Sequence, residues 1–356
     1  MKGFGAMKIS VCMIVKDEEE VIERCLKTVL CFADEIIVVD TGSVDATREK
    51  VSKYTDKIYD FIWINDFSAA RNYAFSKASG DYLFWLDADD VVPEEDGRKI
   101  SELKRVSEPA DTYMMKYYAS ADKNGNPQFE YYRERLMKKC DKAFFCGFIH
   151  ECVAPFGKIV YSDVKVIHKK EKLTNGSRNL DIFEYHIKKG KVLNARERYY
   201  YGKEFFYAGD YARCAEELKK FLDMKYIYGA DEWDALLTCF LCYEKTGKRG
   251  GIEFLFEALK KFGPDSKTFC VLGDYYRKNL SLKNAEVYYK TALACGAGHN
   301  GFFNESKYFF LEPALRLVAL YFEGGEYEKA KKFHLMCKKY YPLNESVIFN
   351  DKFFKV

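Results

Sequence analysis

The first half of the chain, from Lys8 to about Lys170, alternates short apolar runs with amphipathic segments. Helical spacing of apolar residues predicts a helix from about Glu18 to Leu30 and further helices that begin near Asp45 and after Asp66. Four apolar runs predict buried strands: Ile9–Val15, Glu35–Val39, Lys57–Tyr59 and Tyr82–Leu86. Strands that alternate with helices predict a parallel sheet.

Three later runs extend this sheet. Asp111–Ser120 and Phe129–Lys138 are rich in residues that favour strands and flank a predicted turn at Lys123–Pro127. Ile159–Ile167 predicts one more strand. We expect these strands to join in mixed orientation, which gives an α/β domain with a mixed, largely parallel sheet.

From about Arg196 onward, helical patterns dominate. They predict four helical hairpins, at about 196–225, 232–263, 266–296 and 313–342. Ala215 and Ala285 occupy similar positions 70 residues apart, which is twice a 35-residue period and close to the tetratricopeptide length. The longer interval to Ala330 requires an insertion around 296–306. An all-α helical solenoid of tetratricopeptide type is therefore predicted.

A chain of 356 residues favours two domains. We predict an α/β domain over 1–170, a linker or helix over 171–195, and a helical repeat domain over 196–356.

Composition narrows the class of protein. Hydrophobic residues at 48% and charged residues at 31% indicate a soluble protein with real cores. A net charge of +3 gives no sign of nucleic-acid binding. No apolar stretch approaches the roughly 20 residues that span a bilayer. The apolar start lacks a signal-peptide cleavage site, and the twelve cysteines lie scattered in apolar segments, as buried reduced thiols do. We therefore expect a cytoplasmic protein.

Acidic residues follow the ends of three predicted strands. Asp17 follows the first strand, Asp40 the second, and the run Asp87-Ala88-Asp89-Asp90 follows the strand at 82–86. Ligands bind at this edge of an open parallel sheet, so we expect the carboxylates to converge. Neighbouring carboxylates repel unless a cation lies between them, and oxygen ligands suit Mg²⁺ or Mn²⁺. The alternative interpretation is an acidic turn without a metal.

Three further side chains are candidates for chemistry. Arg71 lies on the apolar stripe of the helix after Asp66, where its guanidinium needs an anion. Arg71 either forms a structural salt bridge with a nearby acid or holds a nucleotide phosphate or Asp87 in the site. His168 ends the strand at 159–167 and is a candidate metal ligand. Glu151, next to His150, is either a general base or an ordinary turn acid.

Several enzyme classes lack their signatures in this sequence. No Gly-x-Gly-x-x-Gly follows the first strand, and no Walker-type phosphate loop occurs. The Gly-x-Ser-x-Gly elbow of many hydrolases is also absent.

Four ordered motifs carry a family resemblance. They are Ser10–Glu18, Val38–Thr47, Asp66–Asn72 and Gly80–Asp90. Together they resemble family-two glycosyltransferases of the GT-A fold, over about Lys8 to His168. With the helical repeats attached, the chain is similar to the branch that contains the sublancin-type peptide S-glycosyltransferases.

The resemblance implies roles for individual residues. Val15 and Asp17 would border the base of a nucleotide sugar, Asp40 would contact uracil or ribose, and Arg71 would approach the nucleotide. Asp87 and Asp89 match the Asp-x-Asp motif around Ala88: the first acid orients ribose or Arg71, and the second binds the metal. His168 matches a histidine that completes the metal shell. Glu151 matches the catalytic base of inverting members, although the local sequence is His-Glu where Glu-Asp is commoner.

These implications define the leading hypothesis and its alternatives. The leading hypothesis is a Mn²⁺- or Mg²⁺-dependent inverting glycosyltransferase that moves a hexose from a UDP-sugar to a peptide or protein side chain. Its helical domain would bind the acceptor or form a homodimer. One alternative is transfer to a cell-envelope glycan or lipid-linked saccharide. The other is a repeat scaffold that binds nucleotide sugar without catalysis.

Overall fold

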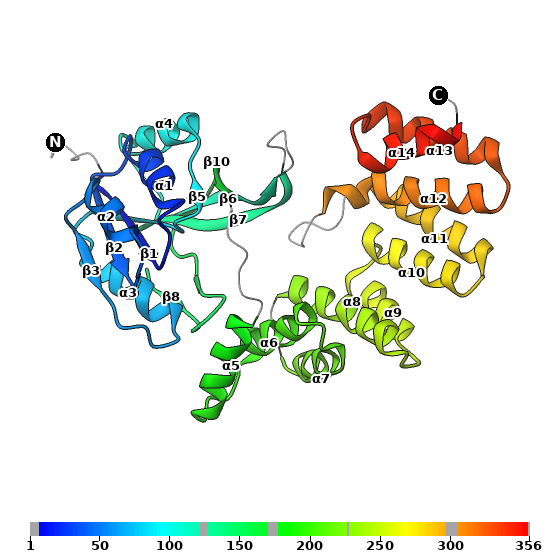
Figure 1. The fold of residues 1–356 in the computed structure, drawn as a ribbon, viewed down its shortest axis with the longest axis horizontal. Coiled ribbons are helices and arrows are strands. Elements are labelled where there is room, and N and C mark those ends of the chain that lie inside the picture. The colour runs from blue at the N-terminus through cyan, green and yellow to red at the C-terminus, as the bar shows by residue number, and fades with distance from the viewer. Residues whose placement is uncertain (1–6, 122–126, 170–176, 226–227, 297–304, 355–356) are drawn as a thin grey trace. The chain divides into compact units, whose positions relative to one another are not determined.

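The computed structural model describes residues 7–121, 127–169, 177–225, 228–296 and 305–354, and its chain divides into two compact units, Met1–Leu193 and Asn194–Val356 (Figure 1). The predicted turn at Lys123–Pro127 falls almost entirely outside the described residues. The predicted insertion around 296–306 does so too for most of its length.

The first unit contains one eight-stranded sheet with helices on its two faces. Its sheet order is β3-β2-β1-β4-β7-β6-β10-β5, and a small hairpin, β8-β9, lies apart from it. The strands are β1 (Ile9–Val15), β2 (Glu35–Asp40), β3 (Ile58–Asp60), β4 (Tyr82–Leu86), β5 (Asp90–Val91), β6 (Thr112–Ala121), β7 (Pro127–Lys138), β8 (Phe145–Cys146), β9 (Cys152–Val153) and β10 (Ile159–His168). The helices are α1 (Ile22–Val29), α2 (Thr47–Ser52), α3 (Phe67–Lys77), α4 (Glu94–Leu103) and α5 (Arg178–Lys188).

Strand orientation confirms the predicted mixed, largely parallel sheet. β3, β2, β1 and β4 run parallel to one another, and β10 is parallel to β6. β7 is antiparallel to both β4 and β6, and β5 is antiparallel to β10. As a result, the carboxyl ends of β1, β2 and β4 lie at one edge of the sheet.

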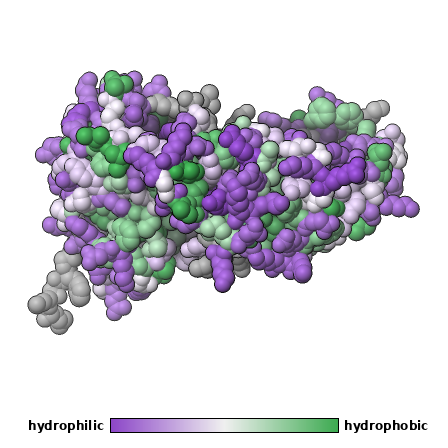
Figure 2. All heavy atoms as spheres, turned by 90° about the horizontal axis from the view of Figure 1, so that it is seen from below, coloured by the Kyte–Doolittle hydropathy of each residue, from purple (hydrophilic) through white to green (hydrophobic). Residues whose placement is uncertain are grey.

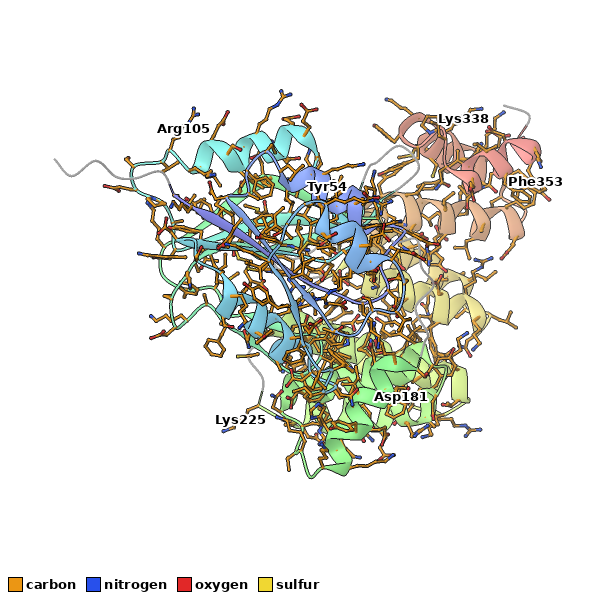
Figure 3. The ribbon with its side chains drawn as sticks, turned by 60° about the vertical axis from the view of Figure 1, so that its left-hand side comes forward. Tyr54, Arg105, Asp181, Lys225, Lys338 and Phe353 are labelled. Carbon is orange, nitrogen blue, oxygen red and sulfur yellow. The ribbon has the colours of Figure 1, made fainter. Side chains whose placement is uncertain are left out.

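Alternate residues of the central strands enter two separate cores. Odd positions of β1, such as Val11 and Met13, pack with α1, α2 and α4 on one face. Cys12 of β1 and Trp85 of β4 pack with α3 and the β8-β9 hairpin on the other. Figure 3 shows side chains filling the space between the sheet and these helices. Both faces are covered, which explains why these strands are apolar at nearly every position.

The predicted helix at 18–30 is shorter in the structure and begins at Ile22. Residues 16–21 instead form turns, and Asp17 adopts a φ of 54°. Two of these residues donate their amides to side chains that follow β2. The Glu18 amide donates to Oγ1 of Thr47 at 2.6 Å, and the Glu19 amide donates to Oδ2 of Asp45 at 3.1 Å. Long-range partners therefore replaced the first helical turn that periodicity alone predicted.

The second unit is all α and is built from antiparallel helical pairs, as predicted. The pairs are α6 (Ala195–Tyr207) with α7 (Tyr211–Leu222), α8 (Gly229–Thr246) with α9 (Ile252–Phe262), α10 (Ser266–Lys278) with α11 (Leu282–Cys295), and α12 (Leu311–Glu323) with α13 (Tyr327–Tyr340). A short 3₁₀ turn, Ser306–Phe309, precedes α12, and α14 (Glu345–Phe354) follows the last pair.

Polar contacts between neighbouring pairs repeat with the sequence period. Tyr199 donates to Asp234 at 2.8 Å, and Trp233 donates to Thr268 at 3.1 Å. Both contacts span 35 residues, as does the 2.7 Å bond from Tyr321 to Glu286. The first two contacts join the first helices of successive pairs, whereas the third joins α12 to the second helix of the preceding pair. Successive pairs therefore stack on one another, which supports a tetratricopeptide-like organisation.

The surface is polar over much of the face shown in Figure 2, with apolar residues interspersed. Within the described residues, we find no helix that combines the length and hydropathy needed to cross a membrane.

Candidate active site

The acidic run after β4 folds into a tight turn at the carboxyl edge of the sheet. The Asp90 amide donates to the carbonyl of Asp87 at 3.1 Å, and the Asp87 amide donates to the Asp90 carboxylate at 3.2 Å. After the turn, β5 pairs with the end of β10 and places Asp90 opposite His168. The Lys169 amide then donates to the carbonyl of Asp89 at 2.9 Å. His168 is thereby brought to the acidic run across 78 residues of sequence.

Asp89, Asp90 and His168 form a candidate metal site. One ligand-type atom from each residue lies within 4.8 Å of the others. Nδ1 of His168 is 3.3 Å from Asp89 and 3.4 Å from Asp90. Hydrogen bonds to Asp89 and then to Asp90 raise the pKa of His168 to about 10. In the metal-free protein, a proton on the imidazole thus supplies positive charge where these carboxylates meet.

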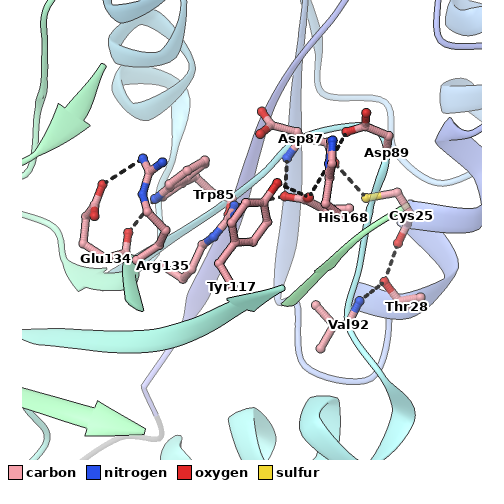
Figure 4. A network of polar contacts seen from close by, with 12 residues as sticks. Cys25, Thr28, Trp85, Asp87, Asp89, Val92, Tyr117, Glu134, Arg135 and His168 are labelled. Carbon is pink, nitrogen blue, oxygen red and sulfur yellow. Dashed lines mark hydrogen bonds and ion pairs between the residues drawn. The ribbon is translucent and has the colours of Figure 1, made fainter. Parts of the chain in front are cut away.

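Asp90 is tied to two strands beyond the turn. Nη1 of Arg135, on β7, lies 3.1 Å from its carboxylate, and both side chains are almost fully buried. The hydroxyl of Tyr117, on β6, donates to the same carboxylate at 3.1 Å. Figure 4 shows Arg135 and Tyr117 beside Trp85, with His168 and Asp89 on the far side of the tyrosine.

Arg71 joins the metal-site turn to the candidate base. Its Nη2 donates to Asp87 and its Nε donates to Glu151, each at 2.6 Å. The arginine is only 8% exposed. Burial by itself would raise the pKa of Asp87, but Arg71 and then Arg135 hold it at about 2. The anions that the guanidinium of Arg71 contacts in this structure are therefore the carboxylates of Asp87 and Glu151.

Trp85 lies at the centre of the positive side chains. The guanidinium carbons of Arg71, Arg133 and Arg135 lie 5.0, 4.8 and 3.8 Å from the centroid of its ring. The indole nitrogen donates to the carbonyl of Glu134 at 2.5 Å. An aromatic face stabilises guanidinium groups that have been removed from water, so Trp85 allows three arginines to share one site.

The charges of this site fit a divalent cation. The cluster contains five carboxylates and three guanidiniums: Asp87, Asp89, Asp90, Glu134 and Glu151, with Arg71, Arg133 and Arg135. With a neutral imidazole, it carries a formal surplus of two negative charges. One Mn²⁺ or Mg²⁺ would balance this surplus, and oxygen ligands with one imidazole suit such an ion.

Asp17 and Asp40 structure the neighbouring loops. Oδ1 of Asp40 accepts the amides of Gly42 and Ser43 at 3.0 and 2.8 Å. Oδ1 of Asp17 accepts the Val44 amide at 2.8 Å, and the Ser43 hydroxyl accepts the Asp17 amide at 3.0 Å. The loops after β1 and β2 are therefore held together at the sheet edge, with one oxygen of each carboxylate already engaged.

Val15 and Ala88 have buried side chains. Val15 is 3% exposed, and its carbonyl accepts both the amide and the hydroxyl of Thr41, at 3.0 and 3.1 Å. Ala88 is 5% exposed and packs in the core beside α1. A nucleotide at this edge would meet the backbone of Ala88 more readily than its side chain.

Helix α5 supports the segment that carries Glu151. His186 stacks on Phe148 with ring centroids 4.1 Å apart and contacts the carbonyl of Asn65 through Nε2 at 2.9 Å. Phe183 packs edge-on against the same Phe148 ring at 5.2 Å. Phe148 in turn accepts the amide of Phe67, the first residue of α3. This helix thus links the start of the Arg71 helix to the loop before Glu151.

The family of the first unit follows from comparison with known proteins. Residues 10–164 match the model described as glycosyl transferase family 2. This segment is a family 2 glycosyltransferase domain. The match confirms the resemblance inferred from the four motifs, and the α/β architecture agrees with the GT-A type expected for the family 2 domain.

Two relatives match parts of the chain. The TPR repeat-containing protein Synpcc7942_0270 of Synechococcus elongatus is 46% identical over 90 residues, which cover 25% of this chain and 22% of that protein. The SPbeta prophage-derived glycosyltransferase SunS of Bacillus subtilis is 27% identical over 233 residues, which cover 60% of this chain and 52% of SunS. The matches therefore span about a fifth of the first relative and about half of SunS.

Among solved structures, the crystal structure of S. aureus TarS 1-349 in complex with UDP-GlcNAc is similar to this chain with a TM-score of 0.39. The alignment has 13% identity and covers 92% of this chain and 90% of the TarS chain.

Sequence reasoning did not find several residues of the site. Arg133, Glu134 and Arg135 lie in a strand that reads only as β-rich, and Tyr117 lies in another. Arginines at alternate positions of an otherwise mixed strand were the available signal, because alternation puts them on one face. Their nearness to Asp90 depends on strand order, which the pattern does not contain.

Proposed function

We propose that the chain is a Mn²⁺- or Mg²⁺-dependent glycosyltransferase that transfers a hexose from a UDP-sugar to an acceptor with inversion at the anomeric carbon. The proposal rests on the family 2 domain and on one observation above others: Arg71 bonds to Asp87 and to Glu151 at once. This bridge puts the candidate base and the candidate metal turn into one site.

Each side chain has a role in this proposal. Asp89 and His168 would hold the cation, whose charge would stabilise the leaving diphosphate. Asp87, fixed by Arg71, would orient the ribose, and the loops of Asp17 and Asp40 would enclose the nucleoside. Val15 and Ala88 would line the same edge through their backbones.

The proposed transfer is a single displacement. An acceptor atom that carries a proton attacks the anomeric carbon, and the bond between that carbon and the phosphate oxygen breaks. UDP leaves with the electron pair, and Glu151 takes the acceptor proton. Nε of Arg71 lies 2.6 Å from Oε1 of Glu151, so the acceptor would hydrogen-bond to a carboxylate that the arginine already orients.

A peptide or protein acceptor is our preferred class. The helical repeats support this choice. Stacked helical pairs provide an extended surface that suits an elongated partner. We also propose that the helical unit either binds this acceptor or forms a homodimer, which analytical ultracentrifugation can test.

Hydrolysis of nucleotide sugars tests the donor and the metal. Purified protein with Mn²⁺ should slowly hydrolyse a UDP-hexose, and Asp89→Asn should abolish this reaction. Asp163→Asn is a matched control, because Asp163 is exposed on β10 and pairs with Lys99. Equal turnover in Asp89→Asn and wild-type protein would show that the metal assignment is wrong.

Transfer to an acceptor tests the base. Glu151→Gln should keep donor hydrolysis and UDP binding but lose transfer, whereas Glu94→Gln on the exposed face of α4 should transfer normally. Mass spectrometry of candidate peptides, proteins and glycans would identify the acceptor. A protein that binds UDP-sugars but neither hydrolyses nor transfers any of them would instead be the non-catalytic scaffold.

A further inference from the structure

Asp90 is a fully buried carboxylate, and hydrogen-bond donors surround both of its oxygens. Oδ2 accepts the Asp87 amide at 3.2 Å and lies 3.1 Å from Nη1 of Arg135. Oδ1 accepts the Tyr117 hydroxyl at 3.1 Å and lies 3.4 Å from Nδ1 of His168. Both oxygens are therefore engaged by the protein's own groups.

Arg135, the ion-pair partner of Asp90, is also buried and held by several contacts. It is 1% exposed, and its guanidinium carbon lies 3.8 Å from the ring centroid of Trp85 and 4.5 Å from that of Tyr117. Nη1 also donates to the carbonyl of Trp85 at 3.2 Å. These contacts hold the guanidinium beside Asp90, and separating the pair would leave a buried charge uncompensated.

The strand order makes Asp90 the meeting point of the site. β5 places it opposite His168 on β10, and β6, which supplies Tyr117, is the other neighbour of β10. Arg135 comes from β7, which pairs with both β6 and β4. A single carboxylate therefore connects the turn after β4 with three further strands.

We propose that Asp90 is a positioning residue of the metal site and not a metal ligand. Arg135 and Tyr117 hold its carboxylate, and the carboxylate in turn orients His168 and closes the turn that carries Asp89. Asp89 and His168 then remain as the protein ligands. Nδ1 of His168 faces both Asp89 and Asp90, so an N–H at Nδ1 that Asp90 accepts fixes the tautomer and leaves Nε2 as the nitrogen for the cation. This inference rests on the proposed metal-dependent function.

Positioning and ligation predict different effects on His168 when the donors to Asp90 are removed. In either role a looser Asp90 weakens metal binding, because hydrogen bonds orient a ligand carboxylate as well as a positioning one. Only if Asp90 positions His168 does the imidazole also lose its orientation toward the cation. The coupling between Mn²⁺ and the His168 nitrogen therefore separates the two roles.

Two variants apply this test without removing a charge. Tyr117→Phe deletes the hydroxyl that donates to Asp90, and Arg135→Lys keeps the charge but loses the planar fork. Tyr113→Phe is the matched control on the same strand, because its hydroxyl accepts the Ala110 amide away from the site. Thermal melts would establish that each variant is folded.

Mn²⁺ binding is the readout, measured by electron paramagnetic resonance with UDP at a fixed concentration. We expect Tyr117→Phe and Arg135→Lys each to bind Mn²⁺ about 10-fold more weakly than wild-type protein. The magnetic coupling between Mn²⁺ and the imidazole nitrogen of His168 should weaken as well. Tyr113→Phe should match wild-type protein in both measurements.

The outcomes separate this inference from the proposed function. If wild-type protein binds Mn²⁺ in a manner that Asp89→Asn abolishes, but Tyr117→Phe and Arg135→Lys keep the wild-type coupling between Mn²⁺ and the His168 nitrogen, Asp90 is not a positioning residue and the proposed function stands. If wild-type protein shows no binding that depends on Asp89, the metal-dependent function is wrong and the positioning role falls with it.

Discussion

Nε of Arg71 lies 2.6 Å from Oε1 of Glu151, although 80 residues separate them in the sequence. The same guanidinium holds Asp87 at 2.6 Å. The orientation of Glu151 therefore depends on how Arg71 divides its hydrogen bonds between the two carboxylates.

Replacing Arg71 by lysine should therefore impair both donor binding and transfer. An ammonium group is a point charge and cannot bridge two carboxylates with the geometry of a guanidinium. We expect Arg71→Lys to lower kcat/KM for transfer by roughly 10- to 100-fold, with a raised KM for the UDP-sugar and a lowered kcat. Arg98→Lys, on an exposed surface of α4, should leave both constants unchanged. Unchanged constants in Arg71→Lys would show that the bridge only stabilises the fold.

Removal of divalent metal should abolish activity and lower the thermal stability of the nucleotide-bound protein. A chelator followed by dialysis should give an inactive protein that Mn²⁺ or Mg²⁺ restores. Because a ligand that binds only the folded state stabilises it, Mn²⁺ with UDP should raise Tm. Asp89→Asn should show a much smaller rise, as measured by differential scanning fluorimetry. An equal rise in both proteins would place the metal elsewhere.

Glu35 should make the first unit sensitive to acid. Its burial alone would raise its pKa, but bonds from Lys57, Ser10 and Ser79 lower it from 4.5 to about 2. The carboxylate also accepts the Gly80 amide at 3.0 Å, which joins β2 to the start of β4.

Because the pKa of Glu35 is lower in the folded protein, its carboxylate stabilises the fold at pH values above its unfolded pKa. This contribution to the free energy of unfolding is lost as pH falls through about 2. The contribution should be about 3 kcal/mol at neutral pH, from the size of the shift. Urea unfolding at pH 7 and pH 3 measures it. We expect Glu35→Gln to be less stable than wild-type protein at pH 7 and closer to it at pH 3. A constant difference between the two pH values would contradict the assignment.

Gly273 should be intolerant of a side chain. A Cβ at this position of α10 would lie 2.3 Å from the ring of Tyr289, a fully buried residue of α11. Gly273→Ala should destabilise the helical unit by about 1–3 kcal/mol, because overpacking outweighs the gain in helix propensity. Gly324→Ala is the control, since the nearest atom to its Cβ would be 3.4 Å away. Urea unfolding followed by circular dichroism compares them, and equal stabilities would show that the α10–α11 contact adapts.

The sequence by itself determined the elements that depend on local pattern. Continuous apolar runs produced β1, β2 and β4, because strands covered on both faces exclude water at every position. The sequence also predicts a helix after Asp66, and in the structure Asp66 caps α3 by accepting the amide of Ala69 at 2.9 Å. Spacing in the second half predicted the helical pairs, because each repeat contacts its neighbours at a fixed interval.

Tertiary structure decided which side chains meet. The motifs place Asp87, Asp89, Arg71 and Glu151 in the chain, but their bonds depend on strand order and on the route of the loop after β8. The alternation of Arg133 and Arg135 places both arginines on one face of β7 but does not identify the partner of Arg135, because a buried charge is stable only where another strand supplies that partner. Local pattern fixes how a segment buries its apolar residues, whereas the pairing of buried charges is settled only when distant strands come together.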